Sequence, residues 1–318
     1  MGRRAFSLTA RACDAAPVTA TLGMVGLGRM GWGMTQRIRE QGLDVVGYDF
    51  APEHRDVASL DDLVAALPAP RVVWVMLPAG DPTETTLTAL HGLLAEGDVV
   101  VEGGNSNFRD SVARAGRFAE RGIGYVDAGV SGGVWGRTEG FCLMVGGADA
   151  HVGRAQPFFD ALAPEGGFVH AGESGAGHFA KMVHNGIEYG LMQAYAEGFE
   201  LMEAADLKID VPATFAAWRY GSVVRSWLLE LMVNALEADP ELAGVRGYAE
   251  DSGEGRWTVN EAVRAAVPLP VISAALFARF ASRQEESIAM KVIASLRHQF
   301  GGHAVLPETG NTKRDVAE

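Results

Sequence analysis

A glycine-rich turn near the start of the chain constrains the fold more than any other feature. The turn reads Gly26-x-Gly28-x-x-Gly31, follows a short apolar segment that begins at Thr21, and opens a segment with helical spacing. A second apolar segment then ends in Asp49, about 20 residues after the turn. A strand, a glycine turn, a helix and a second strand that ends in an acid predict the first βαβ unit of a Rossmann-type, doubly wound parallel sheet.

The same unit predicts a site for a nicotinamide dinucleotide, because the glycines let the pyrophosphate approach the start of the helix. Asp49 can accept hydrogen bonds from both ribose hydroxyls, whereas a 2′-phosphate about 4 Å away would be repelled by about 4 kcal/mol at an effective dielectric of about 20. NAD is therefore expected. NADP stays the alternative, since His54 and Arg55 could turn toward a phosphate. The expected cofactor contacts are Gly26, Leu27, Gly28, Arg29, Met30, Gly31, Asp49, Leu77 and Asn105.

Two further apolar segments, 71–77 and 98–102, predict parallel strands that are covered on both faces. Ligands of doubly wound sheets bind beyond the carboxyl ends of such strands. Asn105 follows the second segment and is expected to contact the nicotinamide and the substrate, with a turn-capping role as the alternative.

A further strand is expected at 125–127, and Ser131-Gly132-Gly133 follows it. A hydroxyl beside bare backbone N–H groups suits a carboxylate or hydroxyl of a substrate. Cys142 lies inside an apolar segment and is expected to be a packed core thiol.

One polar stripe carries the candidate chemistry. At about 100° per residue, Lys181, His184, Asn185 and Glu188 share one face of a helix, and Tyr189 lies at the edge of that face. A base, an acid and two hydrogen-bonding groups on one face favour proton transfer on a small substrate, with a solvated helix face as the alternative. The apolar residues beside the stripe, Met182, Val183 and Ile187, are expected to pack.

Composition excludes several classes of partner. The 318 residues are 48% hydrophobic, enough for two domains, and the net charge of 27 − 40 = −13 disfavours nucleic acids and anionic membranes. Two cysteines indicate a reducing cytoplasm, and the first 20 residues lack an apolar run for a signal peptide or a span. They are basic, so a transit peptide is the alternative. The expected organisation is a disordered extension (1–20), a dinucleotide-binding domain (21–178), an all-α domain for substrate binding and dimerisation (179–304) and a polar tail (305–318).

Six stretches together give a specific resemblance that extends from Leu22 to His303. The chain resembles the short, NAD-preferring 6-phosphogluconate dehydrogenases (decarboxylating) of the β-hydroxyacid dehydrogenase family. The stretch from Lys181 to Gly190 is the most specific, because wider relatives share the glycine turn, Ser-Gly-Gly and the lysine but not His-Asn-Gly-Ile-Glu-Tyr. The stretches are Gly26-Leu-Gly-Arg-Met-Gly31, Gly103-Gly-Asn-Ser106, Ser131-Gly-Gly133, Lys181-Met-Val-His-Asn-Gly-Ile-Glu-Tyr-Gly190, Arg256-Trp-Thr258 and Phe277-Ala-Arg279.

The resemblance implies oxidative decarboxylation of 6-phospho-D-gluconate to ribulose 5-phosphate in the pentose phosphate pathway, without a metal. Lys181 would be the general base and Glu188 the general acid, which requires that the pKa of Lys181 be lowered. Arg279 would anchor the phosphate, while Arg297 and His303 would reach the substrate across the interface of a homodimer or a dimer of dimers. The other substrate-binding residues implied are Asn105, Ser131, Gly132, Gly133, His184, Asn185 and Tyr189.

The chain departs from the family pattern in two places, and both concern the substrate-binding roles that the resemblance implies. The chain is much shorter than the long form, and its phosphate loop has Ser252 where the family has lysine and Glu254 where it has threonine. A carboxylate that points at a phosphate is unfavourable, so the loop must be rearranged or the arginines must hold the phosphate. The alternatives are a 3-hydroxyisobutyrate-type dehydrogenase that acts on an unphosphorylated acid, and a non-catalytic dinucleotide-binding protein. Release of CO₂ separates the first alternative from the leading hypothesis.

Overall fold

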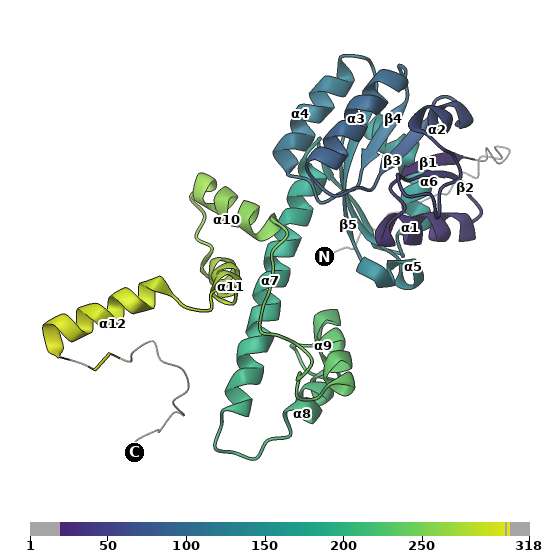
Figure 1. Cartoon of the computed structure of the whole chain (residues 1–318). Helices are drawn as coiled ribbons and strands as arrows, with labels where there is room; N and C mark the ends of the chain where they lie inside the picture. The colour runs from purple at the N-terminus through teal and green to yellow at the C-terminus, as the bar shows by residue number, and fades with distance from the viewer. Residues whose placement is uncertain (1–19, 303, 306–318) are drawn as a thin grey trace, which may run out of the picture. The chain divides into compact units, whose positions relative to one another are not determined.

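The computed structural model describes residues 20–302 and 304–305, which form two compact units (Figure 1). The first unit runs to Glu188 and also includes Gly253–Pro268, and the second comprises Tyr189–Ser252 and the chain from Leu269 onward. The expected N-terminal extension and polar tail, apart from Ala20 and Val305, lie outside the described residues, as does His303.

A seven-stranded sheet in the order β2-β1-β3-β4-β5-β6-β7 forms the centre of the first unit. This doubly wound, mostly parallel sheet confirms the predicted fold class. Only the β5–β6 pair among the described strands is antiparallel, because a short connection of η1 (Gly133–Trp135) and α5 (Gly136–Glu139) replaces the long crossover that parallel strands need. The strands are β1 (Thr21–Val25), β2 (Asp44–Tyr48), β3 (Val72–Val75), β4 (Val99–Glu102), β5 (Gly124–Ser131), β6 (Cys142–Gly146) and β7 (Phe168–Gly172).

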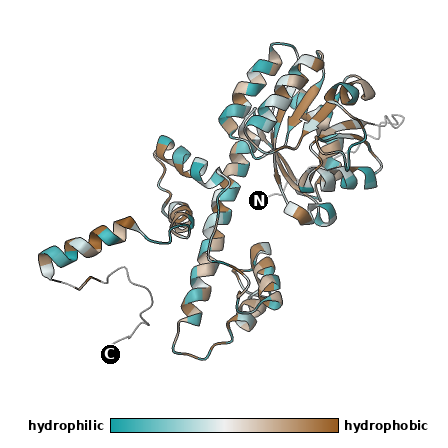
Figure 2. Cartoon of the chain, viewed as in Figure 1, coloured by the Kyte–Doolittle hydropathy of each residue, from teal (hydrophilic) through white to brown (hydrophobic). Residues whose placement is uncertain are grey.

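Helices cover both faces of this sheet, which explains why its central strands β3 and β4 are buried and mostly apolar (Figure 2). On one face, α1 (Arg29–Glu40) and α6 (Asp149–Leu162) contribute Met34, Ile38 and Phe159 to the core. On the other face the core contains Leu63, Leu87 and Phe118, which come from three more helices. These helices are α2 (Leu60–Ala66), α3 (Asp81–Leu93) and α4 (Phe108–Ala119).

The long helix α7 (Ala176–Glu203) begins in the first unit and continues into the second. The first unit also contains α10 (Glu254–Ala265). Within its described residues the second unit consists of helices and loops, with a small core around Val211, Phe215 and Leu229. Its further helices are α8 (Val211–Trp218), α9 (Trp227–Ala238), α11 (Pro270–Ala281) and α12 (Ile288–Gly301). None of the described helices combines the length and the apolarity that a membrane crossing requires.

Candidate active site

The glycine turn between β1 and α1 has the geometry of a dinucleotide cradle. Gly26 has φ +93°, and a Cβ there or at Gly31 would collide with backbone, of Met76 in one case and of Gly26 itself in the other. Gly28, which caps α1, differs because a Cβ built on it has no neighbour within 4 Å. The first and third glycines are therefore needed for packing, and the second leaves open space where a pyrophosphate can meet the helix N-terminus.

A pocket of about 420 Å³ opens beside this turn. The carboxylate of Asp49 borders it and is fixed by the backbone N–H groups of Leu27 at 2.5 Å and Ala51 at 2.9 Å. Trp32 and His54, which also line the pocket, stack with ring centroids 4.3 Å apart. The remaining lining residues are Gly28, Arg29 and Glu53.

Glu53 and Trp32 are residues that sequence reasoning missed at this pocket. Glu53 brings a second carboxylate to the end of β2, and His54 is stacked on an indole. The residues present fit the adenosine end of a nicotinamide dinucleotide, because carboxylates can accept hydrogen bonds from ribose hydroxyls. The only signal for Glu53 in the sequence is its position four residues after Asp49.

The loop after β4 is shaped by close backbone contacts. A Cβ on Gly103 would overlap the indole nitrogen of Trp74, and the N–H of Gly104 donates to Glu102 Oε1 at 2.8 Å. Asn105 is exposed and has no hydrogen-bond partner among the described residues. The turn-capping role belongs instead to Asn107, which accepts from the N–H of Arg109 at 3.0 Å, so the Asn105 carboxamide is available to a ligand.

A buried polar network lies beneath this loop. Glu102 is completely buried, and its Oε2 accepts from Arg114 Nη1 at 3.2 Å and from the hydroxyl of Tyr125 at 3.4 Å. Arg114 Nη1 also donates to Ser106 Oγ at 3.1 Å. Burial, and then the charge of Glu102, raises the pKa of Tyr125 well above its usual value, so the phenol stays a donor. The network therefore holds the loop at both ends through charge-assisted hydrogen bonds.

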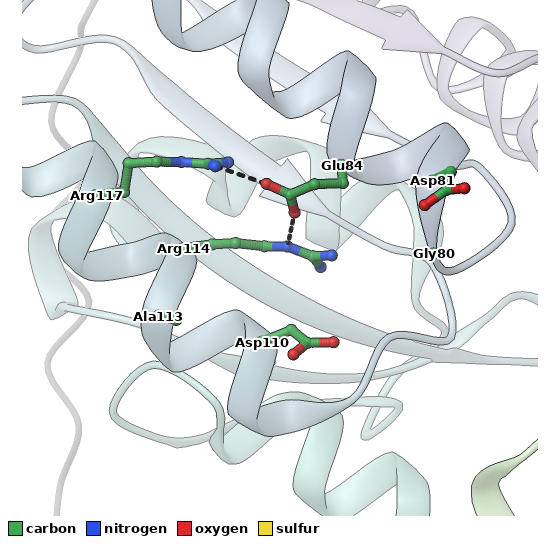
Figure 3. Close-up of a pocket in the computed structure, with 7 residues that line it drawn as sticks. All are labelled: Gly80, Asp81, Glu84, Asp110, Ala113, Arg114 and Arg117. Atoms are coloured by element: carbon green, nitrogen blue, oxygen red, sulfur yellow. Dashed lines mark hydrogen bonds and ion pairs between the residues drawn. The ribbon is translucent and has the colours of Figure 1, made fainter.

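The outer end of the network borders a second pocket of about 440 Å³ between α3 and α4 (Figure 3). There Glu84 lies between two arginines and accepts from Arg114 Nε at 2.9 Å and Arg117 Nη1 at 2.6 Å. Burial raises the pKa of Glu84, but the two arginines lower it by more, so the net shift of the pKa is downward. Arg114 is thus held between an outer and an inner carboxylate, which fixes its position under the loop.

The start of α7 is attached to the sheet by a buried carboxylate. Asp127 on β5 accepts from the N–H groups of Gly175 at 2.6 Å and His178 at 2.8 Å, which satisfies the first turn of the helix. Gly177 brings this turn against the backbone of Asp127 and Met144 without side chains between them. Burial raises the pKa of Asp127, and the interaction with His178 and the backbone donors oppose that rise.

Lys181 occupies the next turn of α7 and is 7% exposed. Its side chain lies against Gly129 of β5, where an added Cβ would be 3.1 Å from Lys181 Cγ. Within the described residues it makes no hydrogen bond or salt bridge. Burial lowers the pKa of Lys181 from its usual 10.5, and the charges of Glu188, Glu254 and Cys142 oppose that effect. The direction is the one that a general base requires.

The expectation that Cys142 packs in the core is wrong. Its side chain is exposed, and in the antiparallel register it faces Ser131. Cys142 is the first residue of β6, and the four residues after it are buried. The expectation was wrong because the apolar neighbours of Cys142 in the sequence do not show that the strand begins at this residue.

The rest of the stripe meets the Ser-Gly-Gly turn. His184 Nε2 is 3.3 Å from Ser131 Oγ, and His184 Nδ1 is 3.0 Å from Asn185 Oδ1 and 3.9 Å from Glu188 Oε2. Because a carboxamide oxygen only accepts, His184 Nδ1 carries a proton and donates to Asn185. Gly132 and Gly133 have φ values of +138° and +55°, and a Cβ on Gly133 would have no neighbour within 4 Å.

The packing expected beside the stripe is found only in part. Met182 is 2% exposed, but Ile187 is 52% exposed, so the expectation for Ile187 is wrong in the single chain. Asn185 is buried, whereas the side chains of His184 and Glu188 are 39% and 36% exposed. Two residues of the polar stripe, Lys181 and Asn185, are therefore buried, which a solvated helix face would not show.

In the second unit, Tyr189 and Arg279 come together. The guanidinium carbon of Arg279 lies 3.5 Å from the centroid of the Tyr189 ring, and its Nη1 donates to the carbonyl of Glu250 at 2.9 Å. Arg297 is exposed on α12 and has no partner within the described part of the chain. Among the described residues no group of three His, Cys, Asp or Glu side chains could hold a metal ion.

Comparisons with known proteins match most of the chain to one family. The NAD binding domain of 6-phosphogluconate dehydrogenase matches residues 21–172, and the C-terminal domain of 6-phosphogluconate dehydrogenase matches residues 177–312. The NAD(+)-dependent, decarboxylating 6-phosphogluconate dehydrogenase of Haloferax volcanii is 42% identical over 296 residues, which cover 89% of this chain and 98% of that protein. The Bacillus subtilis protein YqeC, whose name is given as putative 6-phosphogluconate dehydrogenase, is 39% identical over 292 residues, with the same two coverages of 89% and 98%. The structure of Plasmodium falciparum 6-phosphogluconate dehydrogenase has a TM-score of 0.76 at 26% identity and covers 92% of this chain and 67% of that one.

Proposed function

The chain belongs to the 6-phosphogluconate dehydrogenase family, and on that basis we propose that it oxidises and decarboxylates 6-phospho-D-gluconate to ribulose 5-phosphate and CO₂ with NAD. The observation that carries the proposal is Lys181, a buried amine without a hydrogen-bond partner in the described residues, on the same helix face as Glu188. The reaction would be the decarboxylating step of the pentose phosphate pathway.

Lys181 and Glu188 would move the protons of this reaction. The neutral amine of Lys181 takes the proton of the C3 hydroxyl as that carbon is oxidised, and the ammonium returns it to the C3 oxygen when the carboxylate leaves as CO₂. Protonated Glu188 gives a proton to the carbon that lost CO₂, while Lys181 takes the enol proton and a ketone forms. Passage of that proton from Lys181 to Glu188 restores both groups.

The cofactor and the sugar acid would be held by separate parts of the first unit. NAD, bound at the Gly26–Gly31 turn with its ribose on Asp49, would supply the hydride acceptor. Asn105 and the exposed N–H groups of the Ser131–Gly133 turn would bind substrate oxygens. His184 would position the Ser131 hydroxyl, whose oxygen lies 3.3 Å from the ring nitrogen Nε2.

For the phosphate we propose Arg279, whose guanidinium is oriented by the Tyr189 ring and the Glu250 carbonyl. We further propose that a homodimer completes each site with Arg297 and His303 of the second subunit. Arg279→Lys keeps the charge but loses the planar contact, so the KM for 6-phosphogluconate should rise while the KM for NAD stays constant.

One assay tests the reaction and its alternatives. The protein is incubated with 6-phosphogluconate or gluconate, each with NAD or NADP, and NAD(P)H absorbance and CO₂ are followed. We expect stoichiometric NADH and CO₂ from 6-phosphogluconate alone. NADH without CO₂, or turnover of unphosphorylated acids, would favour a 3-hydroxyisobutyrate-type enzyme, and no substrate-dependent absorbance would favour a non-catalytic protein.

Two variants test the residue roles. Lys181→Met should abolish turnover while NAD still binds, because only the base is removed. Glu188→Gln should reduce the overall reaction severely, since the carboxamide cannot donate the required proton. Near wild-type kcat in either variant contradicts that residue's role. The choice of NAD is tested by kcat/KM for both cofactors, because the Plasmodium falciparum relative is described with NADP+ as its cofactor.

A further inference from the structure

Glu254 opens α10 and is 2% exposed, although it occupies the loop expected to meet a phosphate. A carboxylate at the mouth of a phosphate site would be solvated and would repel the ligand. The burial of Glu254 shows that this side chain turns into the protein, within the first unit that also holds Lys181.

The first turn of α10 is fixed directly against the helix turn of Lys181. The buried hydroxyl of Thr258 lies 2.9 Å from the carbonyl oxygen of Met182 and 2.8 Å from that of Glu254, so one side chain joins the two helices. Met182 is the residue after Lys181. Gly253, with φ +106°, permits the sharp turn that brings Glu254 into this position.

Three ionisable groups from three elements favour the charged form of the Lys181 amine. Glu188 lies on α7, Glu254 on α10 and Cys142 on β6, and each favours the charged amine against burial. Glu188 and Cys142 are accessible to solvent, whereas Glu254 is almost completely buried. A buried charge is screened less than an exposed one, so the influence of Glu254 persists when a ligand or salt screens the others.

We propose that Glu254 is a positioning residue of the proton-transfer site, whose buried carboxylate acts on the amine of Lys181 and not on the substrate phosphate. This inference rests on the proposed function for its chemical meaning, because Lys181 must both accept and return a proton. The carboxylate opposes the effect of burial, so the amine alternates between its neutral and charged forms instead of remaining neutral. The phosphate is then left to arginines.

The test measures the amine itself, without turnover. The chain contains four lysines, Lys181, Lys208, Lys291 and Lys313, so protein labelled with ¹³C at lysine Cε gives few signals, and Lys181→Met assigns one of them. We expect the Lys181 signal to titrate below the others. In Glu254→Gln its midpoint should fall by a further amount on the order of one pH unit.

Two further variants make the result specific. Glu261→Gln changes the same residue type on the same helix, but Glu261 is paired with Arg109 and Arg264, so the Lys181 midpoint should not move. Glu254→Asp keeps the charge on a shorter side chain and should shift the midpoint less than Glu254→Gln. If Glu254→Gln fails to fold, the comparison of Glu254→Asp with wild type decides. An unchanged midpoint, or an equal shift in Glu261→Gln, overturns the proposal.

Kinetics separates this inference from the function on which it rests. In Glu254→Gln the acid limb of the kcat/KM profile for 6-phosphogluconate should move to lower pH by the same amount, and kcat should fall. The KM should change little, because no phosphate contact is lost. If the wild type does not turn over 6-phosphogluconate but the lysine midpoint still moves, the proposed function fails while the coupling of Glu254 to Lys181 stands.

Discussion

Replacement of Gly129 by alanine tests how β5 positions the base. A Cβ at this position would be 3.1 Å from Lys181 Cγ, 3.0 Å from the carbonyl oxygen of Gly177, and closer still to Lys181 Cβ. Because non-bonded carbon atoms prefer separations of about 3.5–4.0 Å, the first turns of α7 must move by about 1 Å. The atoms in contact are a backbone carbonyl and the first two carbons of the Lys181 side chain, and none of them can move away without the helix.

The expected cost has two parts. Overpacking of this kind destabilises by about 1–3 kcal/mol, and each kcal/mol lowers Tm by about 2–4 °C in a unit of about 150–250 residues. A misplacement of about 1 Å at a reacting group can cost about 100-fold in rate. We therefore expect a fall in kcat of about 100-fold in Gly129→Ala, which is far more than the modest loss of stability would produce at 25 °C.

Three measurements check this expectation. NADH absorbance gives kcat, thermal unfolding gives Tm, and fluorescence titration gives the Kd of NAD, which should not change because the glycine turn is distant in the fold. Gly116→Ala in α4 is the control, since a Cβ there has no neighbour within 4 Å. Wild-type kcat in a folded Gly129→Ala protein would refute the argument that the strand backbone positions Lys181.

The remaining predictions concern the cofactor, the helix start and the folding energy. Asp49→Ala should lower kcat/KM for NAD and raise the NADP/NAD ratio of kcat/KM, because a repulsion of up to about 4 kcal/mol toward the 2′-phosphate is removed; an unchanged ratio would contradict this. Asp127→Ala leaves two N–H groups without their acceptor and should cost about 1–3 kcal/mol in urea unfolding. Lys181 binds fewer protons when folded than when unfolded between its lowered pKa and 10.5, so stability should rise with pH in that window. Lys181→Met should lose this pH dependence, and urea titrations of both proteins at several pH values decide the point.

Sequence reasoning identified the fold because local signals and overall topology agree in the first half of the chain. The glycine turn lies between two apolar strands and ends at an acid, which few folds other than a doubly wound sheet satisfy. The helix stripe was equally readable, since Lys181 and Glu188 are related by helical spacing alone.

The features that sequence reasoning missed depend on which way a side chain turns at an element boundary. Cys142, the first residue of β6, is exposed although its apolar flanks predicted burial. Glu254 is the first residue of α10 and is buried, and the sequence did not give the direction of its side chain. The Glu102–Arg114 pair joins a strand to a helix that packs beside it, and a single sequence gives no distance between them. Such long-range polar contacts require the packed structure.

The buried network also ties the candidate ligand loop to the helix of the base. His178 Nδ1 is 2.7 Å from Ser111 Oγ and 3.7 Å from Glu102 Oε2, and the backbone N–H of His178 donates to Asp127, so this one residue of α7 contacts α4, β4 and β5. Water can reach the amides of Gly104, Gly175 and His178 only when this junction opens. We therefore expect the loop and the helix start to exchange their amide protons with solvent together, as one cooperative segment.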